Sequence, residues 1–144
     1  MTLLQIKQVT YQTKKADIRH IRTKVFQEEQ GVAAELEFDG WDDSVVHLLA
    51  YLNGQAIATT RIRDIDANIA KIERVAVLPE YRRQGVGEQL MEAALKTIAT
   101  SQKSQVIVHA QEYIKPLYQK FGFVVVGDRF SEAGIPHVKM LKQL

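Results

Sequence analysis

The 144 residues of this sequence suit a single domain with one hydrophobic core, and we predict one domain over residues 1–144. The net charge of +2 argues against strong attraction to nucleic acid or a membrane surface, and the lack of cysteine excludes disulfides, thiolate nucleophiles and zinc–thiolate sites. Because no stretch resembles a secretory signal or could span a bilayer, we predict a cytoplasmic enzyme or binding module, monomeric or homodimeric, without a metal.

The N-terminal half is predicted to contain three strands and one helix. Leu4–Val9 alternates apolar and polar side chains as a strand does. Residues 17–29 have the spacing of a helix, with one apolar face formed by Ile18, Ile21, Val25 and Phe26. The segments Val46–Leu52 and 55–63 flank Asn53-Gly54, a dipeptide that strongly favours a β-hairpin.

The C-terminal half is predicted to alternate strands and helices. A turn at residues 66–68 leads into a strand over Ile69–Val77. The helix that follows has its apolar side chains at helical spacing: Leu90, Met91, Ala94, Leu95 and Ile98. A buried strand at 106–109, a helix at 112–121 and strands at 123–130 and 137–141 complete the chain. The expected fold class is α/β, with a mixed, mainly antiparallel central sheet flanked by helices.

The turn between the strand Ile69–Val77 and the next helix has the features of an anion site. It reads Arg82-Arg83-Gln84-Gly85-Val86-Gly87, and a helix beginning there leaves backbone N–H groups without intrahelical partners. Glycines allow a ligand to approach the backbone closely, and the two arginines add fork-shaped donors. Leu90 rules out a dinucleotide fingerprint and Glu88 rules out a Walker loop. The alternative is an ordinary turn with solvated arginines.

These motifs together resemble a known family. Arg82-Arg83-Gln84-Gly85-Val86-Gly87 resembles the Arg/Gln-x-x-Gly-x-Gly/Ala signature of the GNAT superfamily of acetyl-CoA-dependent N-acetyltransferases, and Tyr118 before Gly122-Phe123 resembles its second signature. Ala110-Gln111 and Gly134-Ile135-Pro136-His137 are similar to the ElaA-like branch, as is Val25-Phe26 followed by Glu29-Gln30-Gly31. The resemblance covers most of the chain.

The resemblance implies a binding site for acetyl-CoA. Its pyrophosphate would be held by the cradle, which comprises Arg82, Arg83, Gln84, Gly85, Val86, Gly87 and Glu88. The pantetheine arm would pair with backbone groups of the strand at Val75, Ala76 and Val77. Many relatives have an asparagine six residues before the tyrosine, where this sequence has Glu112, so the contact at that point is in question.

The resemblance also implies that Tyr118 protonates the leaving thiolate. The alternative for Tyr118 is a packing role beside Leu117 and Phe121. An N–H near Val75 is expected to stabilise the oxyanion. For the general base the first choice is Glu73, and His109, His137 or a chain of water molecules are the alternatives. Lys71 occupies a second position where some relatives have glutamate.

The acceptor is expected to be an amine, and a charge asymmetry suggests a cationic one. Residues 25–60 contain no lysine or arginine but include Glu28, Glu29, Glu35, Glu37, Asp39, Asp42 and Asp43. An acidic wall would attract a cation, so Glu29 and Glu37 are predicted to bind the acceptor together with His137. The alternative is a solvated acidic loop.

The predicted function is acetyl transfer from acetyl-CoA to the primary amine of a small molecule or an exposed amino group. A second reading within the same fold is transfer to another nucleophile or from another acyl-CoA. A reading from a different class is a non-catalytic module that binds acyl-CoA as a sensor. Tyr118 favours the enzyme, because a sensor needs no proton donor for the thiolate.

Overall fold

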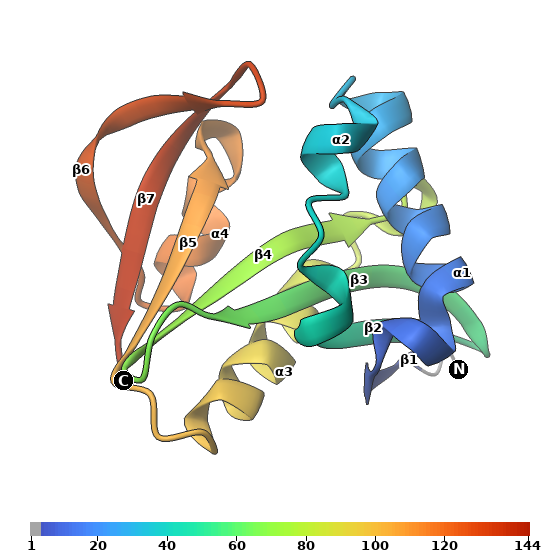
Figure 1. The fold of residues 1–144 in the computed structure, drawn as a ribbon, viewed down its shortest axis with the longest axis horizontal. Coiled ribbons are helices and arrows are strands. Elements are labelled where there is room, and N and C mark those ends of the chain that lie inside the picture. Colours follow the sequence, from blue (N-terminus) through green and yellow to red (C-terminus); the bar gives the residue numbers. More distant parts are fainter. Residues whose placement is uncertain (1–3) are drawn as a thin grey trace.

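A computed structural model describes residues 4–144 and confirms the predicted fold class. These residues form one seven-stranded sheet in the order β1-β2-β3-β4-β5-β7-β6 (Figure 1). The strands are β1 (Leu4–Val9), β2 (Val46–Leu52), β3 (Gln55–Asp64), β4 (Ile69–Val77), β5 (Gln105–Gln111), β6 (Val124–Glu132) and β7 (Ile135–Gln143). The helices are α1 (Tyr11–Arg22), α2 (Ala34–Glu37), α3 (Val86–Ala99) and α4 (Lys115–Lys120). Within residues 4–144 no helix is both long and apolar enough to cross a membrane.

Two hydrophobic cores form on opposite faces of the sheet. Leu48 and Ala50 on β2 belong to the core that includes Leu90 of α3, whereas Leu49 between them packs with Ile18 of α1. Successive side chains of a strand point to opposite faces, so α1 and α3 cover the sheet from opposite sides. The core under α3 continues into β5 and α4.

The two tight hairpins form where the backbone adopts left-handed angles. Asn53 and Gly54 have φ values of 50° and 85° and join β2 to β3, which confirms the predicted hairpin. Ala133 and Gly134 have φ values of 51° and 77° and join β6 to β7 in the same way. The second turn brings Glu132 and Ile135 together as strand partners.

The first helix begins earlier than its apolar spacing predicts. Thr10 is the N-cap, and its hydroxyl accepts a hydrogen bond from the Thr13 N–H at 3.3 Å. After Arg22 the chain continues as a π-helical segment over Thr23–Glu29. The predicted helix at 112–121 is similarly divided, into a 3₁₀ turn over Glu112–Ile114 followed by α4.

The sheet opens between β4 and β5. These two strands pair in parallel over Ile69–Lys71, where the register ends, and Figure 1 shows them diverging beyond that point. On the other edge of β4 the two residues Arg74 and Val75 lie opposite Thr60 alone, which makes a β-bulge. Arg74 sits in the bulge with a φ of 56°. Beyond Lys71, β4 therefore has no strand neighbour among residues 4–144 on the side of β5.

Candidate functional site

A cleft of about 340 Å³ lies where the sheet opens, next to the start of α3. It is lined by Val25, Gln30, Val75, Ala76, Val77, Tyr81, Arg82, Arg83, Gly85, Val86, Gly87, Glu88, Tyr113, Ile114 and Leu117. This set contains every predicted cofactor-binding residue except Gln84 and Tyr118. The structure thus brings the β4 strand and the cradle together in one cleft.

The N-terminus of α3 offers free backbone donors to this cleft. Gly85 is the N-cap in the left-handed conformation with a φ of 79°, and it has no side chain to occupy the helix end. The first hydrogen bond of the helix runs from the Gln89 N–H to the Gly85 carbonyl at 3.1 Å. The preceding N–H groups therefore point out of the helix end, where the dipole favours an anion. This geometry fits a pyrophosphate.

Arg82 is already held in place beside the cleft. Its two terminal nitrogens each lie 2.6 Å from an oxygen of Glu29, and its Nε donates to the Val77 carbonyl at 3.0 Å. The hydrogen bonds from Arg82 lower the pKa of Glu29. In the described part of the chain Glu29 lines neither this cleft nor the acceptor cavity described next, which argues against its predicted contact with the acceptor.

A second cavity, of about 370 Å³, adjoins the cleft and is called here the acceptor cavity. The two share Gln30, Val75, Tyr113 and Ile114 in their linings. The polar side chains that line the acceptor cavity are Gln30, Glu37, Asp39, Arg63, Lys71, Glu73, Arg74, His109, Gln111, Tyr113, Tyr118, Glu132 and His137. Glu112, whose contact with the pantetheine arm the sequence left open, pairs with Arg129 on β6. The cleft and the acceptor cavity meet at Val75.

Tyr118 lies on α4 at the wall of the acceptor cavity. Its ring packs edge-on against Phe123 with centroids 5.8 Å apart, and the residue is 5% exposed. Its hydroxyl makes no hydrogen bond with any residue from 4 to 144. Burial raises the pKa of Tyr118, so the phenol keeps its proton at neutral pH and stays available as a donor.

The predicted base, Glu73, is held by cations. Its Oε1 accepts hydrogen bonds from the Nε atoms of Arg61 and Arg63, both at 2.9 Å, and Lys71 lies 3.3 Å from Oε2. Burial alone would raise the pKa of Glu73, but the charges of Arg61, Arg63 and Lys71 outweigh it and lower that pKa. A carboxylate that has a lowered pKa and is surrounded by three cations is a weak base, which argues against the prediction for Glu73.

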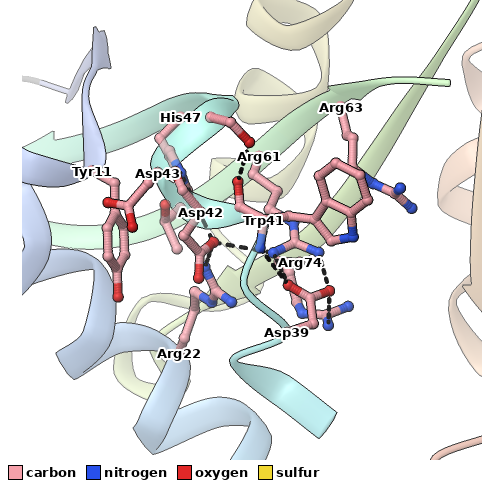
Figure 2. Close-up of polar contacts among 12 residues, drawn as sticks. Tyr11, Arg22, Asp39, Trp41, Asp42, Asp43, His47, Arg61, Arg63 and Arg74 are labelled. Carbon is pink, nitrogen blue, oxygen red and sulfur yellow. Dashed lines mark hydrogen bonds and ion pairs between the residues drawn. The ribbon is translucent and has the colours of Figure 1, made fainter. Parts of the chain in front are cut away.

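The acidic segment is largely neutralised by buried arginines. Figure 2 shows Asp42 between Arg22 and Arg61, whose nitrogens lie 2.6 and 3.0 Å from its Oδ1. Arg61 also binds both oxygens of Asp39, at 2.9 and 2.7 Å. Burial would raise the pKa of Asp42, but Arg22 and Arg61 lower it overall. These carboxylates fix the loop before β2 to the sheet.

Glu37 is part of the same ion network. It is 1% exposed, its Oε1 accepts from the Arg22 Nε at 2.7 Å, and the Nε of Arg74 lies 3.2 Å from that oxygen. Arg74 also donates to the backbone carbonyls of Leu36 and Glu37, which holds the bulge of β4 against α2. Since Glu37 is matched by two arginines, the predicted acidic wall presents little free negative charge, and the basis for a cationic acceptor is weakened.

Two histidines and a glutamate, on β5, β6 and β7, form a separate group in the lining of the acceptor cavity. His109 Nδ1 lies 3.0 Å from Glu132 Oε1, and His137 Nδ1 lies 2.7 Å from the Ile135 carbonyl oxygen. Carboxylate and carbonyl oxygens only accept, so Nδ1 carries the hydrogen in each ring. The neutral form of His109 then bears its lone pair on Nε2. The hydrogen bond from His109 lowers the pKa of Glu132, although burial opposes it.

Sequence reasoning missed Glu132, Arg63 and Arg74 as lining residues. Arg61 and Arg63 are two residues apart on β3, so the sequence alone indicates that their side chains point to the same face of the sheet. Glu132 reaches His109 through the β6–β7 hairpin, and no short-range pattern indicates that contact. Arg74 enters the cavity wall because of the β4 bulge, which likewise leaves no signal in the sequence.

The glycine at the start of α3 provides a test of the cleft. A Cβ on Gly87 would lie 4.0 Å from the Leu117 side chain, so Gly87→Ala fits, whereas the longer side chain of Gly87→Leu would enter the cleft. Both changes favour the helix. We expect Gly87→Leu to weaken coenzyme A binding at least about tenfold, or about 1.4 kcal/mol, by calorimetry. Parent-like binding by folded Gly87→Leu would contradict the assignment; Gly87→Ala is the matched control.

Comparison with known proteins agrees with this geometry. Residues 9–144 match the family model described as an acetyltransferase (GNAT) domain. The uncharacterized N-acetyltransferase YjcF of Bacillus subtilis is 36% identical over 127 residues, 88% of this chain and 90% of YjcF. Protein ElaA of Escherichia coli is 32% identical over 128 residues, 86% of this chain and 84% of ElaA.

Solved structures show the same fold. The crystal structure of Escherichia coli ElaA has a TM-score of 0.87 and 28% identity, covering 97% of this chain and 99% of that one. A GNAT family acetyltransferase from Elizabethkingia anophelis, solved with acetyl-CoA bound, has a TM-score of 0.76 and 18% identity over 98% of each chain. The family match spans nearly the whole sequence, and Arg82, Arg83, Gly85, Val86 and Gly87 of the first signature line the cleft. The chain therefore belongs to the GNAT acetyltransferase family, with ElaA among its relatives.

Proposed function

We propose that this protein is an acetyl-CoA-dependent N-acetyltransferase whose acceptor is the primary amine of a small molecule or an exposed amino group. The observation that carries the proposal is the junction of the cofactor cleft and the acceptor cavity at Val75. A cleft with free helix N–H groups suits the phosphates of a nucleotide cofactor, and the adjoining cavity holds titratable side chains suited to proton transfer. A cytoplasmic location remains a prediction.

Different residues of the cleft would bind different parts of acetyl-CoA. The N–H groups at the start of α3 and the side chains of Arg82 and Arg83 would hold the pyrophosphate. The open edge of β4 at Val75–Val77 would pair with the pantetheine amides. When bound, acetyl-CoA supplies an activated acetyl group on a thioester. A backbone N–H near Val75 would stabilise the negative charge that develops on the acetyl oxygen.

The acceptor cavity supplies the two proton-transfer groups. An ammonium has no lone pair, so the acceptor must lose a proton before it attacks, and His109 would accept that proton on Nε2. Glu132 would hold the ring in this orientation and stabilise its charged form. As the C–S bond breaks, Tyr118 would donate its hydrogen to the departing sulfur, whose own pKa also rises in a buried site. The second proton that the nitrogen loses on forming the amide would restore the Tyr118 phenol. His137 would contact the acceptor from the same wall.

The test of the function is a screen of primary amines with acetyl-CoA. Transfer predicts release of one thiol for each amine consumed and a product heavier by one acetyl group, both dependent on the protein. If another acyl-CoA or a hydroxyl acceptor reacts faster, the protein is instead an acyltransferase that uses another acyl-CoA or another nucleophile. Tight coenzyme A binding with no thiol release for any amine would instead identify a sensor module.

The role of His109 predicts a graded loss of activity. His109→Gln should lower kcat/KM about a hundredfold, because the group that accepts the proton is gone. Glu132→Gln keeps an acceptor for the His109 Nδ1–H but removes the negative charge beside the ring, so it should lower kcat/KM by a smaller factor. Parental kcat/KM in both variants would exclude His109 as the base.

A further inference from the structure

Two cations face the acceptor cavity from neighbouring strands. Arg63 on β3 and Lys71 on β4 are direct strand partners, and both line the cavity. Like charges placed opposite each other across an antiparallel pair destabilise a sheet. Glu73, two residues after Lys71 on the same face of β4, offsets part of that repulsion.

Glu73 positions both cations without neutralising them. Its Oε1 accepts from the Nε of Arg63 at 2.9 Å, and its Oε2 lies 3.3 Å from the Lys71 ammonium. The same Oε1 also accepts from Arg61 at 2.9 Å. One carboxylate therefore faces three cations, and the pair that lines the cavity keeps unbalanced positive charge.

Both cations retain unused hydrogen-bond donors. Lys71 is 9% exposed, and its ammonium makes no hydrogen bond with any residue between 4 and 144. Arg63 uses Nε on Glu73 and stacks its guanidinium on the ring of Trp41, 4.7 Å from the centroid, where Figure 2 shows it extending past the indole. Its two terminal nitrogens have no hydrogen-bond partner in that same range. The Arg63 side chain is 21% exposed, so its free donors and those of the Lys71 ammonium are open to a guest in the cavity, and an anion suits them.

The carboxylates of the cavity, in contrast, each lie beside a cation. The pairs are Glu37 with Arg22 and Arg74, Asp39 with Arg61 and Arg74, Glu73 with Arg61 and Arg63, and Glu132 with His109. The Oε2 atom of Glu37, on α2, is buried without a hydrogen-bond partner among residues 4–144. At the β3–β4 wall the single carboxylate of Glu73 is shared by several cations, so the groups there that are free to bind an acceptor are donors.

We propose that Arg63 and Lys71 bind a carboxylate of the acceptor, whose amine lies at the other end, near Val75. The inference rests on the proposed function for the amine end. Lys71 lies four residues before Val75 on β4, at most about 13 Å along the strand. The amine and the carboxylate are therefore separated by several bonds, as in an ω-amino acid. A guanidinium fork and an ammonium are well suited to a carboxylate.

Three amines of equal chain length test this preference: ω-aminohexanoate, hexylamine and hexamethylenediamine. With the parent protein, ω-aminohexanoate should have the lowest KM. Lys71→Met should raise its KM roughly ten- to a hundredfold while leaving the KM of hexylamine unchanged. Lys71→Arg keeps the cation and should restore most of the affinity. Lys96→Met, an exposed lysine on α3, is the matched control and should change none of the three.

Calorimetry of ω-aminohexanoate binding to protein saturated with coenzyme A separates this inference from the proposed function. Binding that requires Lys71, in a protein that transfers no acetyl group, would support the carboxylate site and overturn the transferase. Acetyl transfer with equal KM for all three amines, or an equal effect of Lys71→Met on each, would keep the transferase and overturn the carboxylate site.

Discussion

Tyr118→Phe should fold normally, bind acetyl-CoA with parental affinity and turn over about a hundred to ten thousand times more slowly. This factor corresponds to roughly 3 to 5 kcal/mol of activation free energy. The substitution keeps the ring that packs edge-on against Phe123 and removes a hydroxyl that hydrogen-bonds to none of residues 4–144. The loss should therefore appear in kcat rather than in cofactor affinity, as measured by steady-state kinetics and calorimetry.

The identity of the acyl donor provides the control for Tyr118→Phe. A donor whose thiol leaves readily as an anion needs less protonation, so the deficit of the variant should shrink with it. Phe121→Leu alters a partly buried apolar neighbour on the same segment without touching the hydroxyl and should retain kcat. Near-parental turnover of folded, cofactor-competent Tyr118→Phe, where chemistry limits the rate, would leave Tyr118 only a packing role.

Arg61→Met should lower the free energy of unfolding by about 3 to 5 kcal/mol, since it takes a buried cation away from three carboxylates, which then share the remaining cations. Arg61 is 1% exposed and binds Asp39, Asp42 and Glu73 at distances of 2.7 to 3.0 Å. Such a loss is a large part of the 5 to 15 kcal/mol that typically stabilises a domain. Urea unfolding would measure this loss in the free energy of unfolding, and we expect the m-value to be unchanged.

An exposed ion pair is the matched control for Arg61→Met. Lys24 and Glu28 are 3.6 Å apart with side chains 49% and 57% exposed, so Lys24→Met should cost less than about 1 kcal/mol. An equally small loss for Arg61→Met would show that the network does not stabilise the fold. Arg61→Lys keeps the charge but not the fork and should fall between the two.

The same network sets the response of stability to acid. The pKa of Asp39, Asp42 and Glu73 is lowered in the folded protein. Their stabilising contribution is thus complete above the unfolded-state values of about 4 and is lost as the pH falls through the lower folded values. In Arg61→Met each carboxylate loses one of its cations, so the stability difference from the parent should narrow as acid protonates these carboxylates.

The sequence predicted the strands, the hairpin at Asn53-Gly54 and the cradle because these depend on local rules of periodicity and turn chemistry. The start of α1 was placed too late because Thr10 acts as its cap before the apolar spacing becomes regular. The site was harder to predict, because Glu73 meets Arg61 and Arg63 across strands, which removes the basicity expected of a lone carboxylate. Glu37 was expected to be free for the acceptor, but residues 15 and 37 positions away, Arg22 and Arg74, bind it.

The most direct test of how the two cavities work together is a crystal structure of the protein with coenzyme A. We expect the pyrophosphate within hydrogen-bonding distance of the N–H groups of residues 85–88, and the thiol beside Val75 facing the Tyr118 hydroxyl. Coenzyme A bound away from the start of α3, or a thiol that does not reach the junction of the cleft and the acceptor cavity, would contradict it.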